Sequence, residues 1–290
     1  MFNYEKAFSR NIGWVTEEEQ QILRNKRVAI AGAGGVGVAT QIHAGLMRDG
    51  LSDEQAKQRI YILDSQGLVF DDRDNLDDFK QGFAKNRTKE ASWHKVAKVS
   101  LDELLATIPV SVLIGTSGVH GAFQAQHVQA MLKHNHQPMI FPLSNPNSKS
   151  EATPEDIYHW SDGRAIVATG SPYANVEYKG KSNRIGQGNN VFIFPGVGLA
   201  SILGKVSQVT IEMFTIASFA LAECVSEEDL AQGAVYPEIH RLREISAYVA
   251  KAIMSQQLLN EPDNPFKVED LDEYIAERMW VPKYLPYKRV

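Results

Sequence analysis

The 290-residue sequence contains a single cysteine, Cys224, and this scarcity excludes a disulfide framework and a zinc ribbon. The apolar helical pattern around Cys224 predicts a buried core residue. No uninterrupted apolar run is long enough to span a bilayer, and no signal peptide is visible. A sustained basic stripe is also missing, and the net charge is −5 at pH 7. We therefore expect a cytoplasmic protein with neither nucleic acid nor membrane as partner.

Glycine occurs in a pattern typical of phosphate binding. Lys26 to Gly32 is a short β-branched run that predicts a buried strand. It enters Gly32-Ala33-Gly34-Gly35-Val36-Gly37, which fits G-x-G-x-x-G. We predict that this turn binds the pyrophosphate of a dinucleotide, with Gly32 for the tight turn, Gly34 for close backbone approach and Gly37 for helix packing on the strand. The helix predicted from about Val38 to Arg48 directs its positive end at the phosphates.

An acid ends the next predicted strand, which runs from Ile60 to Leu63. In dinucleotide-binding folds, an acid at the position of Asp64 accepts hydrogen bonds from the adenosine ribose. Three further acids follow at positions 71, 72 and 74, with only Arg73 between them. This acidic surround should repel a 2′-phosphate, so NAD is favoured over NADP. We interpret the acidic run itself as a solvated loop and not as a metal site.

Strands and helices continue to alternate, which predicts an α/β fold with a Rossmann-like, doubly wound parallel sheet. Polar residues follow the strand ends, where open α/β sheets bind ligands. We predict cofactor contacts from Thr116 and Ser117 after one strand, and Asn145 lies after the next. Thr153 and Pro154 have the pattern of a helix N-cap followed by its first residue. The strands in this part are predicted at Val110 to Gly115, Pro138 to Pro142 and Ala165 to Gly170.

Two adjacent asparagines, Asn189 and Asn190, precede the apolar run Val191 to Phe194, which we interpret as a strand. An amide placed beside a core must be hydrogen-bonded, and Asn suits a nicotinamide carboxamide or a small carboxylate. From about Val197 the pattern is helical, and Trp280 to Val290 reads as an extended tail. We predict a helical leader at 1–25, an NAD-binding domain at 26–200, and added C-terminal helices with a tail at 201–290.

Several stretches in order resemble the cofactor-binding half of malic enzymes. Their joint occurrence over most of the chain makes the resemblance specific. The stretches include Leu63-Asp64-Ser65-Gln66-Gly67-Leu68, Phe141-Pro142-Leu143-Ser144-Asn145-Pro146, Glu151-Ala152-Thr153-Pro154-Glu155-Asp156, Gly186-Gln187-Gly188-Asn189-Asn190 and Val235-Tyr236-Pro237.

The resemblance implies oxidative decarboxylation of malate to pyruvate and CO₂, with reduction of NAD and with Mg²⁺ or Mn²⁺. It implies that Asn145 and Asn190 meet the nicotinamide ribose and the substrate. In the family, a lysine base, a tyrosine acid and the metal carboxylates lie upstream of the glycine turn. The Phe-Glu-Asp-Phe and Asn-Asp-Asp-Ile stretches that hold those carboxylates are not found here. We expect this chain alone to bind NAD and to turn malate over slowly or not at all, whether as a homo-oligomer or with a partner that supplies the missing domain.

Residues 1 to about 37 resemble the opening of the ThiF family of ATP-dependent adenylating enzymes. The resemblance runs from Ala7 through the helical segment after Thr16 to Gly37. Later ThiF features, such as paired Cys-x-x-Cys motifs, are not found. Two alternatives to a malic enzyme therefore stay open: a dinucleotide-binding module without chemistry, and a ThiF-type adenylating enzyme.

Overall fold

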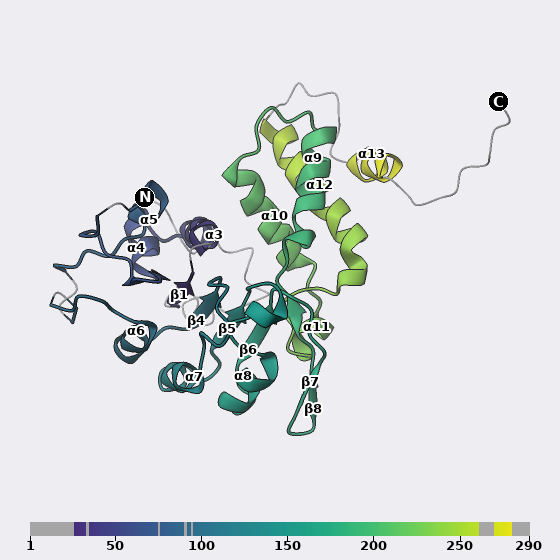
Figure 1. Cartoon of the computed structure of the whole chain (residues 1–290). Coiled ribbons are helices and arrows are strands. Elements are labelled where there is room, and N and C mark those ends of the chain that lie inside the picture. The colour runs from purple at the N-terminus through teal and green to yellow at the C-terminus, as the bar shows by residue number, and fades with distance from the viewer. Residues whose placement is uncertain are drawn as a thin grey trace. The chain divides into compact units, whose positions relative to one another are not determined.

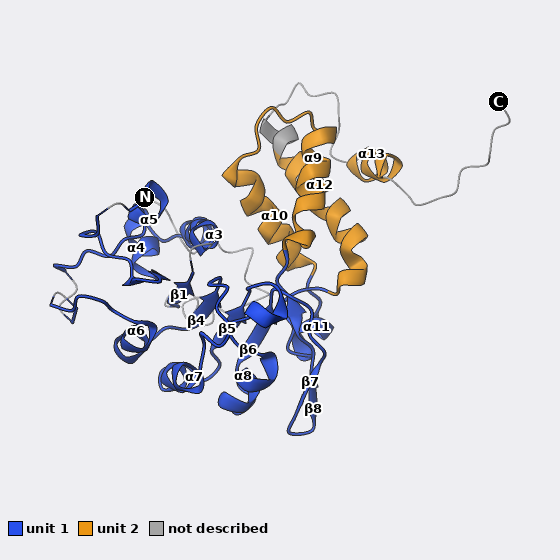
Figure 2. Ribbon diagram, in the orientation of Figure 1, with its two compact units in different colours: residues 1–189, 225–237 blue, residues 190–224, 238–290 orange. Residues whose placement is uncertain are grey.

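The computed structural model describes residues 26–32, 35–74, 76–89, 92–93, 95–260 and 270–279 (Figure 1). The chain divides into two compact units, residues 1–189 with 225–237, and residues 190–224 with 238–290 (Figure 2). The predicted leader and tail, together with Ala33 and Gly34, lie outside the described residues. The domain boundaries at 25/26 and 200/201 stay a prediction.

Unit 1 is built on a seven-stranded sheet with the order β3-β2-β1-β4-β5-β6-β9. All neighbouring strands pair in parallel except β2 and β3, which are antiparallel. This arrangement confirms the predicted α/β fold with a doubly wound, mostly parallel sheet. The strands are β1 (Val28–Ala31), β2 (Ile60–Asp64), β3 (Gly67–Leu68), β4 (Val112–Gly115), β5 (Met139–Pro142), β6 (Ile166–Thr169) and β9 (Gly186–Gln187), and β7 (Val176–Tyr178) forms a separate hairpin with β8 (Lys181–Asn183).

Helices connect the strands, and their starting points follow local sequence signals. The hydroxyl of Thr153 accepts a hydrogen bond from the Asp156 backbone at 3.1 Å, which confirms Thr153 as an N-cap. A capping box at Ser100 starts a short helix that the sequence reasoning did not single out. In the described residues of unit 1, the helices are α3 (Gly35–Arg48), α4 (Asp53–Gln58), α5 (Asp78–Gln81), α6 (Leu101–Thr107), α7 (Ala125–Leu132), α8 (Pro154–Trp160) and α11 (Glu227–Ala231), with the 3₁₀ turn η1 (Asn147–Lys149).

Successive side chains of a strand point to opposite faces of the sheet. In the central strands both faces are covered, so both sets of side chains are buried. Ala29 and Leu113 belong to a core that also contains residues of α6, α7 and α8. Ile30 and Ile114 belong to a second core with Ala39 of α3. A fully buried Leu or Ile side chain such as Leu113 or Ile30 contributes about 1.5–3 kcal/mol. Figure 1 shows α6, α7 and α8 together on one face of the sheet.

Unit 2 is helical, as predicted for the C-terminal region. Val197 and Ala200 of α9 and Val249 and Ile253 of α12 are buried in it. Cys224 is buried at the C-cap of α10, which confirms its predicted role as a core residue. Its described elements are η2 (Asn190–Phe192), α9 (Phe194–Leu203), α10 (Ile211–Glu223), η3 (Ile239–Arg241), α12 (Leu242–Asn260) and α13 (Leu271–Arg278).

The strand predicted at Val191 to Phe194 was wrong. A 3₁₀ turn covers its first residues, and α9 begins at Phe194. Pro195 lies in the first turn of α9, where its restricted φ favours a helix. The buried positions Phe192, Gly196 and Ala200 recur at helical spacing, so this short apolar run satisfies a helical face rather than a strand.

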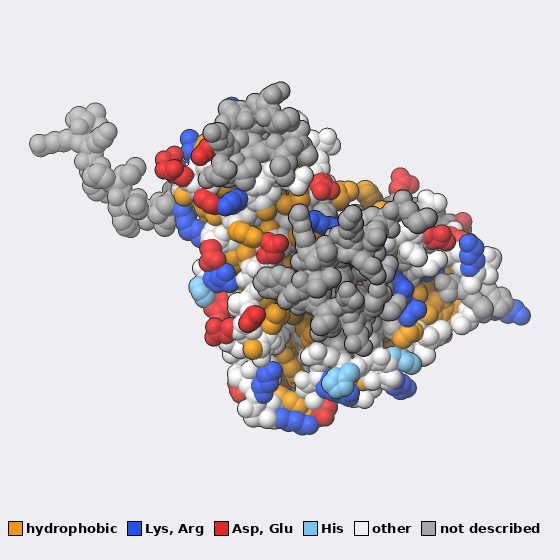
Figure 3. All heavy atoms as spheres, turned by 180° about the vertical axis from the view of Figure 1, so that it is seen from behind, with side chains coloured by type: hydrophobic (Ala, Val, Ile, Leu, Met, Phe, Trp, Pro, Cys, Tyr) orange, Lys and Arg blue, Asp and Glu red, His pale blue; other side chains and the backbone are white. Residues whose placement is uncertain are grey.

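The described surface carries mixed charges. On the face that Figure 3 shows, side chains of both signs are interspersed over the coloured residues. Within the part of the chain that the structure describes, no helix is both long and apolar enough to cross a membrane.

Replacing Thr153 with alanine tests how far local capping stabilises α8. Thr153→Ala removes the hydroxyl that accepts the Asp156 N–H, so we expect the free energy of unfolding to fall by about 1 kcal/mol. Chemical denaturation measures this free energy of unfolding. The matched control is Thr107→Ala at the exposed C-terminal end of α6. Equal losses in the two variants would contradict a capping role.

Candidate functional site

The strand order of the sheet reverses between β1 and β4, so the carboxyl ends of these two strands mark its switch point. β1 pairs with β2 on one edge and with β4 on the other, with Ala31 opposite both Leu63 and Gly115. The residues that follow these strands therefore lie along one edge of the sheet. In doubly wound folds, ligands bind at this switch point.

Gly32 lies directly at the switch point and passes close to the neighbouring turn. Its φ is +131°, and an added Cβ would lie 2.3 Å from the carbonyl carbon of Thr116 and 2.5 Å from the nitrogen of Ser117. The Thr116 N–H donates to the Ala31 carbonyl at 2.8 Å. Only glycine fits this position, and the turn after β1 and the turn after β4 are in contact.

The close packing that we predicted for Gly37 occurs at Gly35 instead. A Cβ on Gly35 would lie 2.3 Å from Cγ2 of the buried Ile30, whereas a Cβ on Gly37 would meet nothing within 4 Å. Helix α3 begins at Gly35, so its first residue faces the strand and Gly37 lies on the exposed side. The motif spacing alone does not decide which glycine faces the strand, because that depends on where the helix starts.

Asp64 ends β2, as predicted, and its carboxylate lies between two cations. Nη1 of Arg73 is 2.8 Å from Oδ1, and Nζ of Lys80 is 3.0 Å from Oδ2. Partial burial by itself would raise the pKa of Asp64. The hydrogen bonds from Arg73, Lys80 and the Gln66 backbone outweigh this effect and hold the pKa below its ordinary value.

The acidic surround predicted for Asp64 needs correction. Asp71 accepts hydrogen bonds from Asn86 and the Arg87 backbone, and Asp72 pairs with Nε of Arg87 at 2.5 Å. The nearest charged partners of Asp64 are Arg73 and Lys80. Local charge therefore gives no argument against a 2′-phosphate, and the sequence reasoning missed Lys80 because it lies sixteen residues after its partner.

A buried carboxylate, also missed from the sequence, joins the ends of β4 and β5. Glu151 is completely buried, and its Oε1 accepts hydrogen bonds from Ser117 N at 2.7 Å, Ser117 Oγ at 2.7 Å and Ser144 Oγ at 2.6 Å. A Cβ on Gly115 would lie 2.5 Å from Cδ of Glu151, so this carboxylate rests against the backbone of β4. No local signal marks Glu151, since its partners come from two other loops.

Asn145 and Asn190, which the family resemblance placed at the cofactor and substrate, belong to different units. Asn145 follows β5 in unit 1, and its side-chain oxygen accepts a hydrogen bond from the hydroxyl of Ser171. The Asn145–Pro146 peptide bond is cis. Asn190 begins η2 in unit 2 and is exposed.

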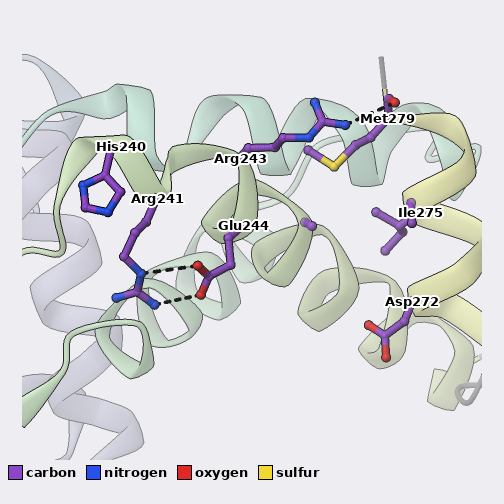
Figure 4. A pocket seen from close by; sticks show the side chains of 9 residues that line it. His240, Arg241, Arg243, Glu244, Asp272, Ile275 and Met279 are labelled. Carbon is purple, nitrogen blue, oxygen red and sulfur yellow. Dashed lines mark hydrogen bonds and ion pairs between the residues drawn. The ribbon is translucent and has the colours of Figure 1, made fainter. Parts of the chain in front are cut away.

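Unit 2 contains an open pocket of about 680 Å³ between its helices (Figure 4). The charged side chains at the pocket pair locally. Arg241 contacts Glu244 at 2.8 Å, and Asp272 contacts Lys251 at 2.5 Å. Arg243 donates to the Met279 carbonyl at 3.4 Å. These pairs lower the capacity of the pocket to bind a charged ligand.

Metal ligands were not predicted in this chain. Across residues 26–32, 35–74, 76–89, 92–93, 95–260 and 270–279, no three His, Cys, Asp or Glu side chains are grouped so that they could hold a metal ion. These described residues therefore offer no complete ligand set for Mg²⁺ or Mn²⁺.

A pair of glycine variants tests the packing of α3 on β1. Gly35→Ala forces a methyl group against Ile30, and we expect a loss of about 1–3 kcal/mol in the free energy of unfolding. Gly37→Ala meets open space within a helix, so stability should be unchanged or rise by up to about 1 kcal/mol. Thermal or denaturant unfolding compares them. The reverse order would show that Gly37 is the packing glycine.

Asp64→Asn tests the ion pairs through their pH dependence. Because the pKa is lowered in the fold, ionised Asp64 stabilises the protein at pH values above about 4, and this contribution is lost as the pH falls through the folded-state pKa. We expect the wild-type advantage over Asp64→Asn, measured by denaturant unfolding at neutral and acid pH, to shrink below about pH 4. The exposed Asp74→Asn serves as control. A wild-type advantage that stays constant with pH would contradict the assignment.

Comparison with known proteins agrees with this geometry. The malic enzyme NAD-binding domain family matches residues 12–258. NAD-dependent malic enzymes of Aeromonas salmonicida, Proteus mirabilis and Psychrobacter cryohalolentis are 42%, 40% and 36% identical over 269, 270 and 273 residues. These alignments cover 92–93% of this chain and 48–49% of the relatives, so the chain spans about half the length of the curated relatives it matches.

The family match also bears on the segment that resembles ThiF proteins. It starts at residue 12, so it includes the glycine turn and much of the stretch before it. The doubly wound sheet, the glycine turn at its switch point and the extent of the match lead to one conclusion: the chain belongs to the malic enzyme family, of which it carries the NAD-binding domain.

Proposed function

We propose that this chain binds NAD and is the cofactor-binding half of an enzyme that oxidatively decarboxylates malate to pyruvate and CO₂. The observation that carries the proposal is the contact of Gly32 with Thr116 at the switch point of the sheet. Because Gly32 has no side chain, the chain after β1 packs against the turn after β4, and the start of α3, an end that favours phosphate groups, follows directly at the switch point.

The proposed cofactor contacts follow from the order of the strands. The turn Gly32-Ala33-Gly34-Gly35-Val36-Gly37 holds the pyrophosphate, with its amides and the positive end of α3. Asp64 accepts the adenosine ribose hydroxyls and shares its remaining lone pairs with its two cations. Thr116 and Ser117 follow β4 on the opposite side of β1, where the second nucleotide would lie.

Asn145 and Asn190 are proposed to meet the nicotinamide ribose and the substrate. Ser171 already donates to the side-chain oxygen of Asn145, so the amide nitrogen is the group that Asn145 offers to a ligand. In the proposed reaction NAD accepts a hydride from C2 of malate. Proton transfer and decarboxylation also need a base, an acid and a divalent metal. Among the described residues, no three His, Cys, Asp or Glu side chains are grouped to hold that metal.

The rest of the catalytic machinery is proposed to come from the half of the relatives that this chain does not match. Unit 2 exposes large apolar side chains, including Ile202, Ile211 and Phe194, with exposed fractions of 76%, 58% and 56%. Exposed apolar surface is typical of an interaction site. A homo-oligomeric state and a cytoplasmic location stay predictions.

Calorimetric titration of the purified chain with NAD⁺, NADP⁺ and ATP tests the proposal. We expect binding of NAD⁺, and weak or no formation of NADH when malate and Mn²⁺ are added. Selective binding of ATP, or pyrophosphate exchange with ATP, would support an adenylating enzyme instead. Rapid NADH formation by the chain alone would contradict the assignment of chemistry to another half, and no binding of any nucleotide would reject the proposal.

A further inference from the structure

The buried carboxylate of Glu151 determines which groups donate and which accept in a small hydrogen-bond network. A carboxylate without a hydrogen-bond donor is costly inside a protein, and here three donors converge on one oxygen. Two of them are the hydroxyl groups of Ser117 and Ser144. The main chain of Glu151 is held as well, since its carbonyl accepts the Phe123 N–H at 2.9 Å.

A serine hydroxyl has one proton, so each serine that donates to Glu151 can only accept elsewhere. Ser144 Oγ accepts the N–H of Gly118 at 2.9 Å, and Ser117 Oγ accepts the N–H of Val119 at 3.2 Å. Both backbone amides of this turn are therefore connected to Glu151 through a serine. The conformation of the turn after β4 depends on a carboxylate that lies at the start of another segment, before α8.

We propose that Glu151 is a positioning residue for the nicotinamide half of the cofactor site. The inference rests on the proposed function, because it assigns a role within the NAD site. Gly32 and Asp64 follow β1 and β2, the half of the fold that serves the adenosine nucleotide. The turns that Glu151 joins follow β4 and β5, on the other side of the switch point, and they lead into Asn145.

Glu151→Gln in the full chain tests this role, with NAD⁺ and AMP as calorimetric probes. Glutamine keeps the size of the side chain but removes the charge and places an amide NH₂ against the Ser144 N–H. We expect the Kd for NAD⁺ to rise about ten-fold, and the Kd for AMP, which uses only the adenosine half, to stay within about two-fold. Glu155→Gln, the same change at an exposed position on α8, is the matched control.

Hydrogen exchange supplies a measurement that needs no ligand. We expect the amides of Gly118 and Val119 to exchange about ten-fold faster in Glu151→Gln than in the wild type or in Glu155→Gln. Ser144→Ala, which removes one acceptor and leaves Glu151 in place, should accelerate Gly118 more than Val119. This second variant keeps the test valid if Glu151→Gln does not fold.

The outcomes separate the inference from the proposed function. If the wild-type chain and Glu151→Gln bind NAD⁺ equally well, the positioning role is overturned. Equal losses for NAD⁺ and AMP would show that Glu151 supports the whole fold and not one half of the site. Unchanged exchange at Gly118 and Val119 would also overturn it. Wild-type chain that binds no NAD⁺ would reject the proposed function and the assignment of Glu151 to a nicotinamide site with it.

Discussion

Parallel hydrogen bonding along both edges of β1 is the constraint on which the rest of unit 1 depends. A strand paired in parallel on both sides requires crossover connections on opposite faces of the sheet, because such crossovers are right-handed. Helix α3 therefore covers one face, and α6, α7 and α8 cover the other. The same pairing aligns the ends of β1, β2 and β4, so Gly32, Asp64 and Thr116 lie along one edge although more than eighty residues of sequence separate the first from the last.

The polar groups at this edge are satisfied in two different ways. Asp64 is partly exposed and is paired with two cations, so a ligand hydroxyl has to share an existing ion-pair network. Glu151 is fully buried and is surrounded by neutral donors. A buried network in which every member has a partner is rigid, because breaking any one bond leaves an unsatisfied polar group. Rigidity at the carboxyl ends of strands is what a preorganised binding site requires.

Membership of the malic enzyme family agrees with a chain that carries a nucleotide-binding fold and about half the length of its relatives. Cofactor binding depends on strand ends and turns that one sheet brings together. Metal binding depends on carboxylate and imidazole side chains that the described residues do not group. In our proposal these two tasks are divided between two parts of a larger protein, and only the first is assigned to this chain.

Much of the fold followed from the sequence, because the signals involved are local. The alternation of strands and helices, the cap at Thr153 and the glycine turn after β1 each depend on residues within a few positions of one another. The glycine that packs on β1 and the partners of Asp64 and Glu151 were decided only by the tertiary structure. Each of these depends on packing between separate elements: Gly35 of α3 faces Ile30 of β1, Lys80 returns to Asp64, and two loops meet at Glu151. Sequence by itself determined most of the elements, and the packing of those elements decided which side chains meet, because contact energies depend on distances in space that no local pattern records.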